Sequence, residues 1–259
     1  MRSRALAALL VAGLVVVAVT SSLSSPVNPT GLPGALANPA GVESSALYCT
    51  GLSDATGATQ GAVVLLNTTD STRDAHVTVV SDTGRLAEEP LTLAAHDSVS
   101  VEPDRLAAGH LFGVSVVVAG GGVVADEVAG SMSSAVPCAS DAVTSWYGSG
   151  FDTTVGSTAT LSFYNPTATP AVVNVTAYTA HGFVAPAPYQ GLPVGAHAEV
   201  AVNIGSAIVN SANVGVRVNV VRGALVVTGV EDSLSVGSLD GGAAAATAQS
   251  WFPRVTTVS

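Results

Sequence analysis

The sequence predicts an all-β protein, with two tandem immunoglobulin-like antiparallel β-sandwiches behind an N-terminal hydrophobic helix. Three observations lead to this prediction. Short segments of alternating apolar and polar residues recur between turn residues, at the spacing of about 8 to 12 residues that is typical of a sandwich. No stretch after residue 23 sustains a helical period. Finally, the pattern of the first half of the chain returns in the second half.

The N-terminal residues predict export. Arg2 and Arg4 precede fifteen apolar residues, Ala5–Val19, which is the layout of a signal peptide. Extension through Leu23 brings this segment close to the roughly 20 residues that span a bilayer. Residues 1–23 are therefore expected to be a signal anchor or a cleaved signal peptide. The first alternative gives a single-pass plasma-membrane protein, held by residues 5–23, with extracytoplasmic C-terminal domains, and the second gives a secreted protein.

Residues 24–44 are rich in Pro, Gly, Ala and Asn and lack periodicity, so a flexible linker is expected there. Strands follow from the period-2 pattern. In a first sandwich, residues 45–140, the expected strands are Ala46–Thr50, Ala62–Leu66, Ala75–Ser81, Leu91–Leu93, Ser98–Glu102, Gly113–Ala119 and Val123–Val128. In a second sandwich, residues 141–259, they are Ser145–Gly148, Ala159–Tyr164, Val172–Thr179, Tyr189–Leu192, Ala198–Asn203, Val214–Val221 and Ala224–Val230.

Three matched blocks support a duplication. Residues 65–84, LLNTTDSTRDAHVTVVSDTG, align without a gap with residues 163–182, FYNPTATPAVVNVTAYTAHG, at an offset of 98. Residues 93–101 resemble 194–202, and residues 113–124 resemble 215–227, in the same order along the chain. Such ordered repetition is the signature of a copied structural module.

Single residues within the repeat have expected roles. Asn67 and Asn165 should open a turn by bonding their own backbone. Gly84 and Gly182 should end the next strand with a positive φ. Tyr48 precedes Trp146 by 98 positions and is expected to match it, which would place the tryptophan near the boundary between the units.

The connections have expected structures as well. Ala119–Val124, AGGGVV, joins two strands and opens no helix, so a hairpin turn is expected rather than a phosphate-binding loop. Asp104–Leu111 could form a turn of helix. Leu234–Gln249 is expected to be an exposed, mobile loop. Residues 251–259 either complete the second sandwich with a strand or begin a truncated third repeat.

Charge excludes two classes of partner. Charged residues make up 10% of the chain, no lysine is present, and the formal net charge is −10. A surface of this sign repels phosphate backbones and anionic headgroups, so no nucleic-acid binding is expected.

The two cysteines, Cys49 and Cys138, are expected to form a disulfide, because an even pair in an exported chain is more often a disulfide than a metal site. Two free buried thiols are the alternative. Closing a loop of this length would stabilise the first unit by about 4 to 5 kcal/mol on the chain-entropy model.

No catalytic residue is expected. Paired acids could support glycoside hydrolysis, but Glu88–Glu89 falls in a polar loop, where solvated charge is ordinary. Asp126–Glu127 and Glu231–Asp232 close equivalent strands, where acids commonly protect a sheet edge. No serine lies in a Gly-x-Ser-x-Gly motif, and no other serine-hydrolase motif has an acid and a base nearby, so a serine hydrolase is not expected.

No metal or cofactor site is expected either. The histidines lack the spacing of a chelating pair, and no calcium-loop motif occurs. The five histidines are His76, His96, His110, His181 and His197. Of these, His96 and His197 are repeat equivalents in a turn before a strand, which favours a structural role.

The aromatic residues concentrate in the second unit. Tyr178, Phe183 and Tyr189 flank one loop and form a candidate ligand patch, because a flat exposed ring can stack on a sugar or a peptide. Core packing is the alternative role for such rings.

The sequence resembles a family of exported, membrane-anchored actinobacterial proteins of unknown function that are built of tandem sandwich repeats. The similarity spans roughly residues 45–256, and it depends on a Trp at the unit boundary, Leu161–Pro166, a Val-rich strand ending at Gly, and Val194–His197 before another strand. The first unit departs from this pattern at Tyr48–Cys49 and Asn67–Thr68. The resemblance implies fold and location, and it carries no catalytic residues.

These observations predict a non-catalytic extracytoplasmic protein of the cell envelope with a binding or scaffolding role. The expected partner is another envelope protein, because low charge density leaves an adhesive polar surface. A glycan-active enzyme that uses Glu231 and Asp232, or a carbohydrate-binding module, is the alternative, so a glycan ligand stays open.

Overall fold

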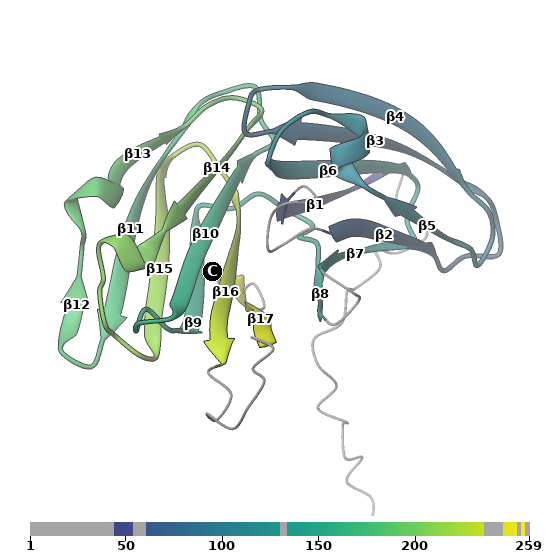
Figure 1. Ribbon diagram of the computed structural model, residues 1–259. Helices are drawn as coiled ribbons and strands as arrows, with labels where there is room; N and C mark the ends of the chain where they lie inside the picture. Colours follow the sequence, from purple (N-terminus) through teal and green to yellow (C-terminus); the bar gives the residue numbers. More distant parts are fainter. Residues whose placement is uncertain (1–43, 54–60, 130–133, 236–245, 253–254, 257–259) are drawn as a thin grey trace, which may run out of the picture. The chain divides into compact units, whose positions relative to one another are not determined.

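The computed structural model describes residues 44–53, 61–129, 134–235, 246–252 and 255–256, all within the unit Ala35–Ser259 (Figure 1). These residues are mostly strand, in antiparallel sheets, with one short α-helix, α2 (Pro103–Leu106), and two 3-10 turns. The all-β prediction is therefore confirmed. The predicted signal or anchor, residues 1–23, and the linker up to residue 43 lie outside this part. Among the described residues, no helix has the length and hydropathy to cross a membrane.

Two four-stranded sheets form the first half of the chain, residues 44–139. Sheet I has the order β1-β6-β3-β4, and sheet II has the order β5-β2-β7-β8. Their strands are β1 (Ser44–Ser53), β2 (Gly61–Asn67), β3 (Arg73–Ser81), β4 (Leu86–Leu93), β5 (Ser98–Val101), β6 (Leu111–Ala119), β7 (Val123–Ala129) and β8 (Ser134–Pro137).

Two further sheets form the second half, residues 143–256. Sheet III has the order β12-β11-β15-β9-β18, with β13 also paired to β11, and sheet IV has the order β14-β10-β16-β17. Their strands are β9 (Ser145–Phe151), β10 (Ser157–Asn165), β11 (Ala171–Thr179), β12 (Gly182–Val184), β13 (Gln190–Val194), β14 (Ala198–Asn203), β15 (Val214–Arg222), β16 (Val226–Ser235), β17 (Ala246–Phe252) and β18 (Val255–Thr256).

The two halves share one strand order. Sheet IV repeats sheet II strand for strand, and β9, β15 and β11 of sheet III repeat β1, β6 and β3 of sheet I. Strands β12 and β13 together take the place of β4, because each pairs with a different end of β11. The duplicated sequence blocks therefore occupy equivalent positions in the two pairs of sheets.

Each half buries its own core of alternating residues, mostly valines. On β3, Val77 and Val79 point inward and are fully buried, whereas the alternate residue His76 points outward and is exposed. The second half repeats this pattern with Val173 and Val175 on β11. The two cores are separate clusters, which fits sandwich-like packing of two sheets in each half.

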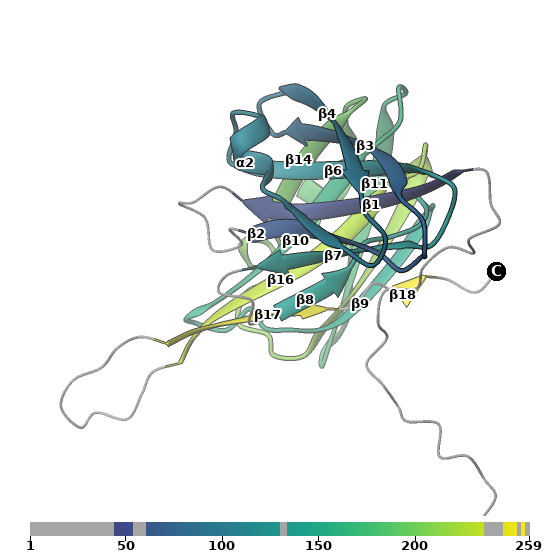
Figure 2. The same ribbon diagram turned by 90° about the vertical axis from the view of Figure 1, so that its right-hand side faces the viewer.

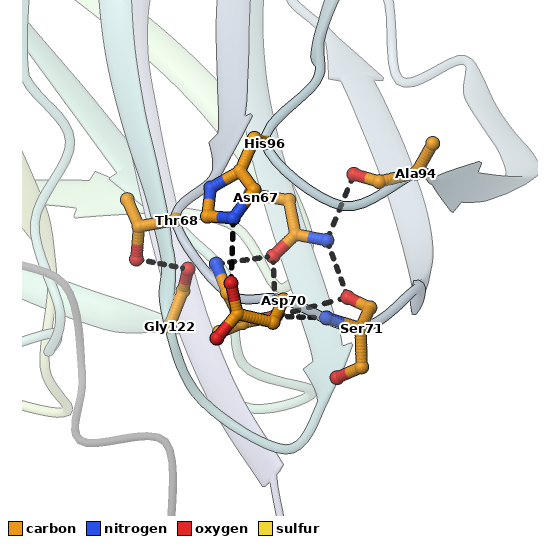
Figure 3. A network of polar contacts seen from close by, with 8 residues as sticks. Asn67, Thr68, Asp70, Ser71, Ala94, His96 and Gly122 are labelled. Atoms are coloured by element: carbon orange, nitrogen blue, oxygen red, sulfur yellow. Dashed lines mark hydrogen bonds and ion pairs between the residues drawn. The ribbon is translucent and has the colours of Figure 1, made fainter.

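A buried asparagine holds the turn after β2 (Figure 3). The Asn67 amide nitrogen donates to the backbone oxygens of Ser71, Leu93 and Ala94, at 2.8 to 3.1 Å. Its Oδ1 accepts from the backbone N–H and the hydroxyl of Thr69. One side chain thus ties its own turn to the end of β4, and the predicted turn role is confirmed.

The same arrangement recurs around Asn165 in the second half. Its amide nitrogen donates to the backbone oxygens of Thr169, Val194 and Gly195, and its Oδ1 accepts from Thr167. Both asparagines are fully buried. Identical bonding at two positions 98 residues apart means that the turn geometry was copied together with the strands.

In the turns before β5 and β14, histidines adopt the left-handed backbone conformation. His96 has φ 57° and His197 has φ 45°, and both precede the equivalent strands β5 and β14. His96 Nε2 lies 2.8 Å from Asp70 Oδ1 (Figure 3). The predicted positive φ is found at Gly84 and Gly182, with values of 74° and 115°, but neither glycine ends a strand: Gly84 lies in the turn after β3, and Gly182 begins β12.

The expected hairpin at Ala119–Val124 is wrong. Strand β6 belongs to sheet I and β7 to sheet II, so the glycines carry the chain from one sheet to the other. Gly120 and Gly122 adopt φ values of 86° and 84°, which a residue with a side chain rarely tolerates. Gly122 also accepts hydrogen bonds from the backbone and hydroxyl of Thr68, which ties this connection to the turn after β2.

Three further expectations need correction. Glu88–Glu89 lie within β4 rather than in a loop, paired with β3. Leu234–Gln249 is not a continuous loop, since β16 runs to Ser235 and β17 begins at Ala246, and the two strands pair (Figure 2). Strands β8 and β12 were not expected from the pattern. Of the two alternatives for the segment from residue 251, pairing favours completion of the second half, because β17 joins sheet IV and β18 joins sheet III.

Pairing also corrects the alignment of the aromatic residues. Tyr48 lies opposite Ser115, and Tyr147 lies opposite Arg217. Tyr48 therefore corresponds to Tyr147 and not to Trp146. The Trp146 ring is buried in the core of the second half, and its Nε1 donates to Leu225 O at 2.9 Å.

The predicted disulfide between Cys49 and Cys138 is confirmed. Cys49 lies on β1 of sheet I, and Cys138 directly follows β8 of sheet II. The bond therefore connects the two sheets of the first half and closes a sequence separation of 89 residues. Its position at the end of the first half also fixes the start of the connection to β9.

Candidate functional site

The outward side of sheet III carries polar and aromatic side chains that are at least partly exposed. On β11, Val173, Val175 and Ala177 point into the core, so Asn174, Thr176 and Tyr178 point outward. On β15 the outward residues are Gly215, Arg217 and Asn219, and on β9 they are Ser145 and Tyr147. We call this surface the open face; it comprises these eight residues and Phe183.

An arginine and a tyrosine stack at the centre of the open face. Arg217 on β15 pairs in register with Thr176 on β11 and with Tyr147 on β9. The guanidinium carbon of Arg217 lies 5.8 Å from the centroid of the Tyr147 ring, within the range of a cation–π interaction. Arg217 Nε has no hydrogen-bond partner among the described residues. The Arg217 Nε atom is itself buried, whereas Tyr147 is 39% exposed.

Two of the three predicted patch residues lie on this face. Tyr178 and Phe183 are cross-strand neighbours on β11 and β12, and they are 46% and 75% exposed. The prediction is wrong for the third residue, Tyr189, which is only 6% exposed. Its hydroxyl donates to Asn203 O and contacts the Ser206 hydroxyl. A 3-10 turn before β13 directs its ring into the core of the second half.

Gly215 leaves space beside Tyr178. A Cβ built at Gly215 would meet Tyr178 Cβ at 3.6 Å and two backbone oxygens at 3.9 Å, which are ordinary contacts. A side chain from another molecule can therefore approach the backbone of β15 at this point.

The charge of sheet III differs from that of the chain. The whole chain has eighteen acids and eight arginines. The strands of sheet III contain Arg217 and Arg222 and no Asp or Glu. An absence of acids combined with exposed Tyr, Phe and Arg is the composition of protein-binding surfaces, which are enriched in aromatic residues and Arg and depleted of Asp, Glu and Lys.

A second polar cluster is buried where the two halves meet. Strand β1 has a bulge at Gly51, which adopts φ 88°. The backbone N–H of Thr50 donates to Glu127 Oε1 at 2.7 Å. The Thr50 hydroxyl and the Gly51 N–H donate to Glu199 Oε1, at 2.5 and 3.3 Å. Glu127 comes from β7 in the first half and Glu199 from β14 in the second, so the bulge connects both halves.

Tyr164 on β10 completes this junction. Its hydroxyl exchanges a hydrogen bond with Ser115 on β6 at 2.6 Å. Its ring covers Gly113 so closely that a Cβ there would lie 2.3 Å from the ring. Burial raises the pKa of the Tyr164 hydroxyl, although the bond to Ser115 opposes the shift. We call this contact of sheet I with sheet IV the junction.

The candidate acid pairs are not brought together as a solvent-facing site. Glu127 is fully buried and accepts a hydrogen bond from the Thr50 N–H, so the prediction that it protects a sheet edge at the surface is wrong. Burial raises the pKa of its neighbour Asp126. Burial also raises the pKa of Glu231, which accepts a hydrogen bond from the Asp152 N–H at 2.8 Å. This bond opposes the shift, whereas the nearby Asp152 charge adds to it.

Among the described residues, one group of potential metal ligands lies close together: Cys49, Glu127 and Cys138. Both sulfur atoms belong to the disulfide, so neither is available as a thiolate ligand. Two of the histidines instead lie beside carboxylates. His76 Nε2 lies 3.9 Å from Glu88 Oε2 across β3 and β4, and His96 Nε2 lies 2.8 Å from Asp70 Oδ1.

These sheets, the disulfide and the open face define an all-β protein in which one strand order occurs twice. Residues 123–252, half of the chain, match the "Family of unknown function (DUF5719)", and the chain belongs to this family. The match begins at β7 and extends through β17, so it includes the junction acids and the open face. The predicted resemblance to a family of unknown function is confirmed at that level. No curated protein and no solved structure is significantly similar to this chain.

Proposed function

We propose that the protein is a non-catalytic extracytoplasmic protein of the cell envelope with a binding or scaffolding role. Residues 5–23 would hold it in the plasma membrane, or direct its secretion if they are cleaved, with residues 24–44 as a linker. The two halves would be immunoglobulin-like sandwich domains, residues 45–140 and 141–259, and the family would consist of membrane-anchored actinobacterial proteins. The disulfide supports export, because such bonds persist in oxidising compartments.

The observation that carries the binding role is the open face. Its Arg217–Tyr147 stack and the exposed Tyr178–Phe183 pair stand on four hydrogen-bonded strands, which hold the side chains in fixed positions. Rigid aromatic residues contribute contact area at low entropic cost. The acid-free face would attract the neutral or acidic surface of another envelope protein.

Site-specific photo-crosslinking in intact membranes tests this role. A photoreactive residue at Tyr147 or Tyr178 should capture the same polypeptide, because both positions belong to one face. A photoreactive residue at Leu86, which is 51% exposed on β4 of the first half, serves as the control and should not capture it. Substitution Arg217→Glu in the Tyr178 variant should reduce the yield at least fivefold. Equal capture from Leu86, or no capture from either tyrosine, would contradict the proposal.

The exposed tyrosine rings also favour a carbohydrate-binding module as a second candidate, because such rings can stack on sugars. A glycan array with the purified protein separates the two. If the array shows binding, and Tyr147→Ala and Tyr178→Ala each abolish it, the result would favour a glycan ligand. An array without signal would favour a protein partner.

A further inference from the structure

The junction shows which sheets of this fold pack against each other. The outward side of sheet I receives the outward side of sheet IV, with Tyr164 over Gly113 and Glu199 on the bulge at Thr50 and Gly51. Val80 on β3 also packs with residues of the second half and is 1% exposed. This contact lies within one chain, and it shows which residues of the two sheets meet.

The open face is the second copy of the sheet I side of this junction. The pairing registers match Gly215 with Gly113 and Tyr147 with Tyr48. Tyr178 lies at the position equivalent to Val80. The bulge is also repeated, because Gly150 adopts φ 86° where Gly51 adopts φ 88°. The backbone that binds sheet IV inside the chain is therefore present a second time, without a partner sheet among the described residues.

Burial separates the covered copy from the open one. Gly113 lies under the Tyr164 ring, whereas Gly215 has room for a side chain. Val80 is 1% exposed, whereas Tyr178 is 46% exposed. The same position on the same strand is thus covered in the first half and accessible in the second.

The complementary surface exists a second time as well. Sheet II repeats sheet IV, and Leu66 on β2 corresponds to Tyr164 on β10, since they pair with the equivalent residues Val124 and Val226. Leu66 is 38% exposed, whereas Tyr164 is 1% exposed. Strand β2 alternates between buried and accessible residues, but β10 is buried on both sides from Leu161 onward.

Charge favours contact between these two accessible surfaces. The strands of sheet II contain Asp126 and Glu127 and no Arg, and the strands of sheet III contain Arg217 and Arg222 and no acid. Asp126 lies on the outward side of sheet II, because its neighbour Glu127 points into the core. Opposite signs on facing patches steer association and disfavour contact of each patch with itself.

We propose that a second copy of this chain binds head to tail, with its sheet II on the open face, repeating the junction with Leu66 of one copy over Gly215 of the next. This inference rests on the proposed scaffolding role and names the partner of that same face. Such a contact is heterologous, so each bound copy presents a further open face and the assembly can grow.

The contact between chains should be weaker than the junction. Within one chain a short connection holds the halves at an effective concentration of the order of millimolar, which two separate chains lack. In addition, Ser98 stands at the position of Glu199, so the carboxylate on the bulge is missing. We therefore expect the associated fraction to rise with protein concentration and to reach saturation only at high concentration.

Cysteine cross-linking of the purified full chain tests the geometry. In the junction, a Cβ on Gly113 would lie 2.5 Å from Tyr164 Cγ, which places the two Cβ atoms within about 4 Å of each other, the separation of a disulfide. Leu66→Cys and Gly215→Cys should therefore bond across the proposed contact. The native disulfide is closed, and Cys49 is fully buried, so it should not interfere.

The two single variants are purified separately, mixed and oxidised. We expect a disulfide-linked heterodimer from the mixture, at least tenfold less dimer from either variant alone, and a ladder of higher oligomers from the double variant. Leu86→Cys mixed with Gly215→Cys is the matched control and should give only background. Circular dichroism should show folded single variants, because Gly215 has room for the new side chain.

A second measurement does not depend on cysteine chemistry. Sedimentation velocity of the unmodified chain should show mass increasing with concentration, and Gly215→Trp should abolish the increase while the variant stays folded. A chain that is monomeric up to about 1 mM, the effective concentration of a short tether, would overturn the proposal. Equal cross-linking from Leu86→Cys, or a Leu66→Cys homodimer in equal yield, would overturn it too.

The outcomes separate this inference from the proposed function. Photo-crosslinking at Tyr147 that captures another polypeptide, together with no Leu66–Gly215 heterodimer, would overturn self-association and leave the envelope-binding role. Failure of both experiments would overturn both. Capture of the chain itself at Tyr147, together with the heterodimer, would support both.

Discussion

Removing the buried asparagine of one turn tests how much the repeated turn stabilises the fold. Asn67→Ala deletes five contacts, three from the amide nitrogen and two to Oδ1. The amide has only two hydrogens, so at most four full hydrogen bonds are lost. At about 1 kcal/mol net for each bond, the free energy of unfolding should fall by about 3 to 4 kcal/mol. Asn165→Ala should cost the same within about 1 kcal/mol, because its bonding is identical.

Urea denaturation monitored by fluorescence and circular dichroism measures this loss. With a slope of about 2 to 3 kcal/mol per molar, the midpoint should shift by about 1 to 2 M. Asn67→Asp keeps the shape of the side chain but places a carboxylate oxygen against three carbonyl oxygens. At pH 7 it should therefore lower the free energy of unfolding at least as much as Asn67→Ala, and protonation of the carboxylate should restore part of the loss. Asn219→Ala on the open face is the control and should stay within about 0.5 kcal/mol. A loss below 1 kcal/mol for Asn67→Ala, or a stable Asn67→Asp variant, would refute the reasoning.

Three further predictions concern the disulfide, the junction and pH. Reduction of the disulfide should lower the free energy of unfolding by about 4 to 5 kcal/mol, because the bond closes a long loop; urea unfolding with and without reductant checks it, and an unchanged midpoint contradicts it. Gly113→Ala should destabilise by about 1 to 3 kcal/mol through its clash with the Tyr164 ring, whereas Gly215→Ala should be close to neutral, so similar thermal midpoints for the two variants would contradict the junction geometry. Burial raises the pKa of Asp126, so the folded chain binds this proton more tightly than the unfolded chain. The resulting stabilisation is fully present below the ordinary aspartate pKa and is lost as the pH rises through the raised pKa of the folded state. Asp126→Asn should therefore stabilise the chain at pH 7 and change little near pH 3, and unfolding at both pH values checks the sign.

The local structure could be predicted from the sequence because the determining residues are adjacent in the chain. Alternating valines placed the β3 and β11 strands, and the Asn67 and Asn165 turns followed from side-chain chemistry within two residues. The disulfide followed from the even cysteine count and the export signal. Each of these features depends on short-range pattern or on simple counting.

The junction could not be predicted in this way, because period-2 alternation assigns a residue to one side of a strand without saying what covers that side. Leu66 and Tyr164 have the same local pattern, yet one is accessible and the other is buried by the other half. For the same reason Glu199 was not recognised as a buried group, and Glu127 was placed at the surface. A cue was present in the sequence: Glu199 stands in a strand where its repeat equivalent is Ser98.

The position of the disulfide has a mechanical consequence. It encloses a sequence separation of 89 residues, from β1 to the segment after β8. If the chain is pulled between its N-terminal end and its C-terminal end, the force passes across the sulfur–sulfur bond and bypasses nearly the whole first half. At about 3.5 Å per extended residue, roughly 300 Å of chain is withheld from stretching. Tension on a tethered molecule would therefore extend the second half alone, while the first half keeps its shape as a rigid spacer.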